Sequence, residues 1–169
     1  TPSAKVSGTF RSATVAANDF KTDQIHVIDS NTVAGGLGSR LSEETVLKPK
    51  PMVEIGGNPI LWHIMKYFSC FRFNDFYVAT GYKEEIIKDY FCNYHKTCGS
   101  MMVDLATGRT VNYSRPPEDW QVHIITTGLK TQTGGRIKRM QDYLNDGEPF
   151  IVTYGDGVAD VDLHALLDF

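Results

Sequence analysis

The segment MVEIGGNPILWHIMKYFSCFRFNDFYVAT, residues 52–80, predicts a strand, a helix and a second strand in succession. The apolar run at 52–55 has the length of a strand, and the turn Gly-Gly-Asn follows it. Pro59 suits the first position of a helix. Apolar side chains then recur at the spacing of one helix face: Ile60, Leu61, Ile64, Met65 and Phe68. The run FYVAT at 76–80 predicts the second strand.

The alternation continues toward the carboxyl end. We expect helices over 84–94 and 135–144, a strand over 150–154, and a last helix capped by Asp162. Short strands separated by turn residues are expected in the middle, at 101–104, 110–113 and 122–126. Strands that alternate with helices predict an α/β fold whose mixed, mostly parallel sheet is flanked by helices, with the middle hairpins as an insertion.

The composition is that of one globular domain. The chain has 169 residues, a net charge of −3, 41% hydrophobic residues and 22% charged residues. No apolar run approaches the ~20 residues that span a bilayer, so we expect no membrane role. Seventeen basic against twenty acidic residues give no excess to attract nucleic acid. Three cysteines without paired spacing, and no secretory signal, predict a cytoplasmic protein.

Three turns carry side chains suited to phosphate chemistry. The first is Gly35-Gly36-Leu37-Gly38-Ser39-Arg40, where glycines allow close approach, consecutive amides form an anion nest, and Arg40 adds charge. It matches neither a Walker A loop nor a dinucleotide fingerprint. Taken alone, such a turn is a plain glycine-rich turn about as often as a binding loop.

The other two turns supply a lysine and a carboxylate. Prolines on both sides of Lys50 stiffen the backbone and aim its ammonium group, although a lone Lys-Pro pair is usually a solvated loop. Asp156 lies between two glycines after a predicted strand, where α/β folds place ligands. One carboxylate with phosphate oxygens is a usual way to hold Mg²⁺, although an Asx-type turn is the commoner use of such a residue. Together the three turns predict a nucleotide site.

A fourth group precedes the helix expected at 135–144. Thr131 opens the segment TQTGGR, whose small residues allow close approach, and Arg136 ends it with a charge. A binding role and a helix-capping role are equally compatible with this segment. The run Arg136, Lys138 and Arg139 is also compatible with a solvated basic face.

These residues carry a family resemblance. The stretch from Ala34 to Met52 resembles the signature of sugar-phosphate nucleotidyltransferases, and the longer runs are similar to those members that act on CTP and glucose 1-phosphate. The segments concerned are SEETVLKPKPMVEIGGNPILWHIMKYF, DFYVATGYKEEIIKDYFCNY, TQTGGRIKRMQDYL and EPFIVTYGDGVADVDLHALLDF. The resemblance extends from about Val33 to Phe169 and implies a Rossmann-like nucleotidyltransferase fold.

The resemblance implies a role for each matching position. The CTP base and phosphates would be held by Val33, Ala34, Gly35, Gly36, Leu37, Gly38, Ser39 and Arg40. Lys50 would contact the phosphates, and Thr131 and Arg136 would line the nucleotide site. Gly155 would touch the substrate, and Asp156 would be a Mg²⁺ ligand.

The implied reaction is attack by the phosphate oxygen of glucose 1-phosphate on the α-phosphorus of CTP, which gives CDP-glucose and pyrophosphate. Arg40 and Lys50 would be the catalytic side chains, acting by charge stabilisation together with the cofactor Mg²⁺. CDP-glucose would serve the synthesis of surface polysaccharides such as O-antigen. The family resemblance also implies a homo-oligomer.

The chain divides at about residue 31. Residues 1–31 form an atypical extension without a family counterpart, expected to be disordered in part, and 32–169 form a nucleotidyltransferase domain that we expect to be truncated at its carboxyl end. The family's second metal-binding aspartate would lie beyond Phe169. QIHVID at 24–29 is a strand candidate ahead of the glycine-rich turn.

Two alternatives remain open: a thymidylyl- or uridylyltransferase of a sugar 1-phosphate, and a nucleotide-binding fragment without catalysis.

Overall fold

A four-stranded parallel sheet forms the centre of the molecule. The computed structural model describes residues 25–29, 48–144 and 150–167; the predicted glycine-rich loop, with Val33 to Arg40, lies outside these ranges. The strands of the sheet are β1 (Ile25–Asp29), β4 (Asp75–Thr80), β7 (Gln121–Thr126) and β8 (Ile151–Tyr154). They lie in the order β7-β4-β1-β8, and every neighbouring pair is parallel. The predicted α/β fold with a mostly parallel sheet is confirmed.

The strand order contains one reversal. The chain adds β4 and then β7 on one side of β1, and returns to add β8 on the other side. The strand order therefore reverses between β1 and β8, the two strands that lie side by side at this point. Ligands of open α/β sheets bind in the crevice that such a reversal creates.

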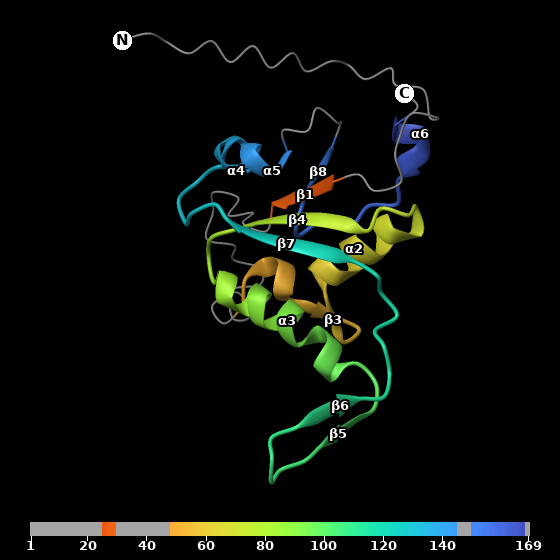
Figure 1. Cartoon of the computed structure of the whole chain (residues 1–169). Coiled ribbons are helices and arrows are strands. Elements are labelled where there is room, and N and C mark those ends of the chain that lie inside the picture. The colour runs from red at the N-terminus through yellow and green to blue at the C-terminus, as the bar shows by residue number, and fades with distance from the viewer. Residues whose placement is uncertain (1–24, 30–47, 145–149, 168–169) are drawn as a thin grey trace.

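Helices cover both faces of the sheet (Figure 1). One face packs on α2 (Ile60–Cys70) and α3 (Glu84–Thr97), and the other on the pair α4 (Thr133–Arg139) and α5 (Gln141–Leu144). Successive side chains of β4 follow this division, because a strand points alternate residues to opposite faces. Phe76 and Val78 belong to the cluster with α2, whereas Ala79 packs with Met140 and Leu144.

The predicted apolar face of α2 is the centre of the larger core. Leu61, Ile64, Met65 and Phe68 are all buried there, at the helical spacing expected from the sequence. Burial of each such side chain contributes about 1.5–3 kcal/mol. Ile87 of α3 and Leu163 of α6 (Leu163–Leu167) complete the cluster. This core supports the sheet from the side of α2 and α3.

Two smaller pairs of strands lie outside the main sheet. Of the three short strands expected to form an insertion, two make a hairpin of β5 (Met101–Val103) and β6 (Thr110–Asn112), which projects from the body of the molecule (Figure 1). The third, expected at 122–126, is instead β7 of the main parallel sheet. The second pair is β2 (Glu54–Ile55) with β3 (Asn58–Pro59), directly before α2. No helix within the described ranges is long and apolar enough to cross a membrane.

The structure refines several expected boundaries. The helix expected over 135–144 begins at Thr133 and is two helices, interrupted at Met140. Met52, expected to open a strand, ends the short 3₁₀ helix η1 (Lys50–Met52). Asp162 caps α6 as expected, its Oδ1 accepting from the amides of His164 and Ala165 at 3.0 and 3.1 Å.

The first strand comes from the amino-terminal extension. Residues 25–29, which our division of the chain placed outside the domain at 32–169, pair with β4 on one side and β8 on the other. The QIHVID segment therefore provides an inner strand of the sheet, the one that lies beside the reversal.

Candidate functional site

Two predicted site residues meet where the strand order reverses. Lys50 Nζ lies 3.8 Å from Asp156 Oδ2, although 106 positions separate the two in the sequence (156 − 50). Their side chains are 33% and 25% exposed, so both are accessible from solvent while partly enclosed. Asp156 follows β8, and β8 pairs with β1. The positive and negative groups therefore lie together at the expected crevice.

A proline-flanked turn positions Lys50. Pro49 has an extended backbone, and η1 then turns the chain with hydrogen bonds from the Met52 amide to Pro49 O (2.8 Å) and from the Val53 amide to Lys50 O (3.0 Å). Pro51 and Met52 are buried, whereas Lys50 is half-buried. The backbone on both sides of the lysine is thus held, and its side chain extends from a rigid base.

The Asp156 carboxylate has the chemistry that a magnesium ion requires. Gly155 is buried at the end of β8, and the aspartate that follows it is half-buried. Mg²⁺ in nucleotide sites commonly takes one or two carboxylates and completes its shell with phosphate oxygens and water. In the part of the chain that the structure describes, no three His, Cys, Asp or Glu side chains gather as a cage. A single carboxylate beside a lysine fits a metal that arrives with its nucleotide.

The other two predicted residues lie at the carboxyl ends of β4 and β7. Arg136 is 2% exposed, and its Nη1 donates to Thr80 O at 3.1 Å and to the hydroxyl of Thr127. Thr131 is half-buried and its hydroxyl donates to Thr127 O at 2.7 Å. The structure therefore brings Thr131 and Arg136 into one hydrogen-bonded group around Thr127. It brings Lys50 and Asp156 together as an ion pair.

Sequence reasoning did not identify Thr80 and Thr127. Thr80 O accepts from the amide and the hydroxyl of Thr127, both at 2.8 Å, and from Arg136. Both threonines are fully buried. The available signal was weak. Thr80 ends the strand predicted at 76–80, Thr127 follows the strand predicted at 122–126, and nothing in the local pattern indicates that the two meet.

The loop after Thr127 is closely packed on Arg139. Arg139 Nη1 donates to Thr127 O, the same carbonyl that Thr131 contacts. Gly128 has φ +92°, and a Cβ at this position would lie 2.6 Å from Arg139 Nη1. The backbone conformation therefore favours glycine here, and a Cβ would in addition displace the end of the Arg139 side chain from this loop.

A carboxylate adjoins this group at the start of α3. Glu84 accepts from Lys88 Nζ at 2.7 Å and from the hydroxyls of Thr80 and Thr126, both at 3.1 Å. The hydrogen bond from the Lys88 ammonium is the main cause that lowers the pKa of Glu84. Glu84 is consequently a carboxylate at neutral pH and fixes the first turn of α3 to β4 and β7.

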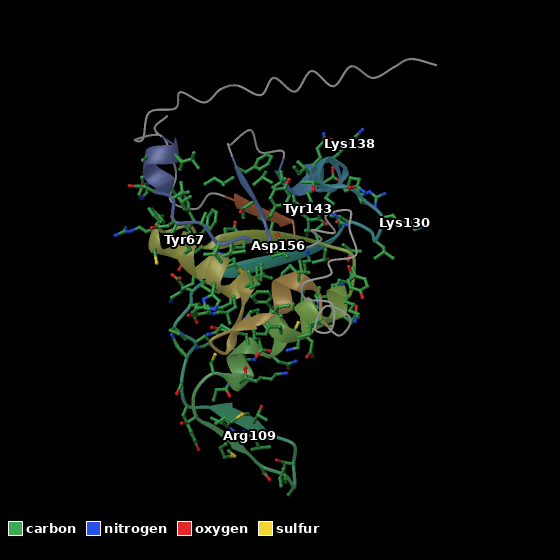
Figure 2. The ribbon with its side chains drawn as sticks, turned by 180° about the vertical axis from the view of Figure 1, so that it is seen from behind. Tyr67, Arg109, Lys130, Lys138, Tyr143 and Asp156 are labelled. Carbon is green, nitrogen blue, oxygen red and sulfur yellow. The ribbon has the colours of Figure 1, made fainter. Side chains whose placement is uncertain are left out.

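The basic run of α4 is divided between the core and the surface. Arg136 is buried, whereas Lys138 and the preceding Lys130 are exposed on the outer side of the molecule (Figure 2). The same view places Asp156 beside the sheet and Arg109 on the projecting hairpin. The solvated-face interpretation therefore applies to Lys138 and not to Arg136.

Comparisons with known proteins show the family to which the chain belongs. A model of the family described as nucleotidyl transferase matches residues 32–169. The glucose-1-phosphate cytidylyltransferase of Salmonella typhimurium (strain LT2) is 51% identical over 137 residues, which are 81% of this chain and 53% of that protein. The probable glucose-1-phosphate cytidylyltransferase of Bacillus subtilis (strain 168) is 44% identical with the same coverage.

A solved structure shares the fold. HddC from Yersinia pseudotuberculosis, in a crystal structure complexed with GMP-PN, has a TM-score of 0.55 and 28% identity, covering 79% of this chain and 48% of that one. The chain spans about half the length of the curated relatives it matches. The parallel sheet flanked by helices is a nucleotidyltransferase domain, and the chain belongs to the nucleotidyl transferase family.

Proposed function

We propose that the chain forms the nucleotide-binding portion of an enzyme that joins CTP and glucose 1-phosphate into CDP-glucose and pyrophosphate. The observation that carries the proposal is the approach of Lys50 and Asp156 to 3.8 Å, with Asp156 directly after β8, the strand beside β1. The choice of CTP and glucose 1-phosphate rests on the names of relatives that are 51% and 44% identical. The proposed product would serve the synthesis of surface polysaccharides such as O-antigen.

The side chains have distinct proposed tasks. Lys50, on its rigid turn, neutralises charge on the CTP phosphates as the α-phosphorus is attacked, and Arg40 shares this task from the glycine-rich loop. Arg136 and Thr131 line the nucleotide site at the ends of β4 and β7, and Gly155 contacts the substrate. The attacking group is the phosphate oxygen of the sugar, so no side chain serves as a nucleophile. Positioning and charge stabilisation account for the catalysis.

We propose Mg²⁺ as the cofactor and Asp156 as its protein ligand. When bound, the ion would neutralise phosphate charge and orient the nucleotide. The role of Asp156 is to hold the ion beside Lys50 through a carboxylate that is accessible from solvent. Exposure of about a quarter of this side chain leaves room for phosphate and water to complete the ion's shell.

The expected setting of the enzyme is a cytoplasmic homo-oligomer. Cys70, Cys92 and Cys98 are free thiols, as is typical of cytoplasmic proteins. The hairpin of β5 and β6 presents apolar side chains to solvent, and Leu105 at its turn is 92% exposed. Exposed apolar side chains on a projecting element support association between copies of the chain.

The direct test is pyrophosphate release with glucose 1-phosphate, Mg²⁺ and each nucleoside triphosphate in turn. We expect release with CTP to exceed release with UTP, TTP and GTP, and chelation of the metal to stop it. Greater pyrophosphate release with TTP or UTP would instead support the alternative of a thymidylyl- or uridylyltransferase. Binding of Mg·CTP to folded protein without pyrophosphate release would support the alternative of a nucleotide-binding fragment. Absence of Mg·CTP binding would contradict both the proposed enzyme and that alternative.

A further inference from the structure

Thr127 joins the carboxyl ends of β4 and β7, the two strands that end at the proposed nucleotide site. It follows β7, and it is fully buried. Its amide and its hydroxyl both donate to Thr80 O at 2.8 Å, and this carbonyl ends β4. The residue is therefore held by two hydrogen bonds to the neighbouring strand, and its side chain has one defined orientation.

The same hydroxyl accepts a hydrogen bond from Arg136. A hydroxyl can donate one proton and accept at its lone pairs, so Thr127 can donate to Thr80 O and accept from Arg136 Nη1 at the same time. Arg136 Nη1 also contacts Thr80 O at 3.1 Å. Two contacts on one nitrogen restrict the orientation of the guanidinium group.

The carbonyl of Thr127 fixes the second candidate nucleotide residue. It accepts from the Thr131 hydroxyl at 2.7 Å and from Arg139 Nη1. One residue thus contacts both Thr131 and Arg136, through its carbonyl and its hydroxyl respectively. Because Thr80, Thr127 and Arg136 are buried, water cannot readily replace a contact that is removed between them.

We infer that Thr127 is a positioning residue for nucleotide binding, whose hydroxyl holds the Arg136 guanidinium against the carboxyl end of β4. The inference rests on the proposed function, since it assigns to Thr127 the orientation of a side chain that the proposal places in the nucleotide site. Thr127 acts through Arg136 and Thr131. The Thr127 hydroxyl makes the contact with Arg136 and one of the two hydrogen bonds to Thr80 O. The hydrogen bonds of the Thr127 amide and carbonyl do not need the side chain, so a variant without the hydroxyl tests the contact with Arg136.

The test compares two substitutions at Thr127 with one at its neighbour, using the full chain and Mg·CTP as the probe. Thr127→Val has nearly the same shape and lacks the hydroxyl, whereas Thr127→Ser retains it. Thr126→Val is the matched control, because the Thr126 hydroxyl is exposed and contacts Glu84 at 3.1 Å instead. Calorimetric titration gives the dissociation constant of each variant, and thermal unfolding gives its stability.

We expect Thr127→Val to weaken Mg·CTP binding roughly tenfold, as for the loss of one hydrogen bond to a charged group. Thr127→Ser and Thr126→Val are expected to bind within about twofold of the unchanged chain, on the same reasoning. A purely structural role would lower the unfolding temperature of Thr127→Val and leave its dissociation constant unchanged. That result would overturn the inference and leave the proposed function intact.

A second measurement does not depend on the folding of a variant. Mg·CTP is expected to slow amide hydrogen exchange of residues 127–136 in the unchanged chain, because nucleotide contact with the half-buried Thr131 would stabilise the group that Thr131 and Arg136 form with Thr127. Binding of Mg·CTP without slower exchange in this segment would overturn the inference alone. If the unchanged chain does not bind Mg·CTP, the inference and the proposed function both fail.

Discussion

At the scale of single residues, the Lys50 ammonium group and the Asp156 carboxylate make a testable pair. Partly exposed ion pairs contribute about 0–1 kcal/mol, so Lys50→Met should leave the unfolding temperature almost unchanged. The same substitution removes a charge that faces phosphates in the proposed complex. We expect Mg·CTP affinity to fall roughly tenfold to a hundredfold, measured by calorimetric titration.

Lys48 provides the control for this prediction. It lies two positions before Lys50 (50 − 48), and its ammonium group pairs with Glu54 Oε1 at 2.6 Å on the surface. Lys48→Met removes the same charge from nearly the same place in the chain, so both variants change any long-range electrostatic attraction equally. Equal loss of affinity in the two variants would mean that Lys50 acts only through net charge.

Residues that act through one local turn could be predicted from the sequence, and residues that act between strands could not. The prolines around Lys50 and the glycines around Asp156 indicated sites of close approach, and the structure places the two side chains together. The roles proposed for them remain predictions. Thr127 was missed because its hydroxyl contacts Thr80, 47 positions away, and that contact depends on the register of β4 with β7.

At the scale of the elements, one partly buried network joins α2 and α3 to the segment before β7. The Glu118 side chain is 3% exposed. Its Oε2 accepts a hydrogen bond from the Tyr94 hydroxyl of α3 at 2.7 Å, and its Oε1 accepts one from Lys66 Nζ of α2 at 3.2 Å. Tyr94 in turn accepts from Trp62 Nε1 at 2.8 Å. Glu118 thus connects two helices on the same face of the sheet.

Tyr94→Phe should weaken this connection. The substitution keeps the ring and removes the hydroxyl, which leaves Glu118 Oε2 and Trp62 Nε1 without that partner. We expect the free energy of unfolding, measured with urea, to fall by about 1–3 kcal/mol. Tyr113→Phe, at a position that is 69% exposed, should change it by less than about 0.5 kcal/mol. Equal effects of the two substitutions would contradict a structural role for the network.

The elements themselves were largely predictable, because periodicity is a local property. The apolar face of α2 and the parallel strands β4 and β8 stand close to where the sequence indicated. The placement of β1 was not predictable in the same way. QIHVID has the pattern of a strand, but its two partners lie about 50 and 125 positions away (75 − 25 and 151 − 26), and no local pattern specifies such pairings.

At the scale of the whole molecule, tyrosines on α3 make stability depend on alkaline pH. Burial is the main cause that raises the pKa of Tyr90 to about 12, and burial together with the hydrogen bond to Glu118 also raises the pKa of Tyr94. An unfolded tyrosine has a pKa of about 10. Above that pH the unfolded chain releases protons that the folded chain retains, so unfolding becomes more favourable as pH rises.

The stabilisation from these phenols should therefore be complete below about pH 10 and be lost as pH rises through about 12, the pKa of folded Tyr90. The urea midpoint, measured at a series of pH values, should fall in this window together with the appearance of phenolate absorbance. Tyr90→Phe removes one titrating group and should make the fall shallower, whereas Tyr113→Phe, at an exposed position, should not. Parallel curves for the unchanged chain and Tyr90→Phe would mean that other groups govern alkaline unfolding. Because α3 packs on the core shared with α2 and the sheet, ionisation of Tyr90 acts on the cooperative unfolding of the whole domain.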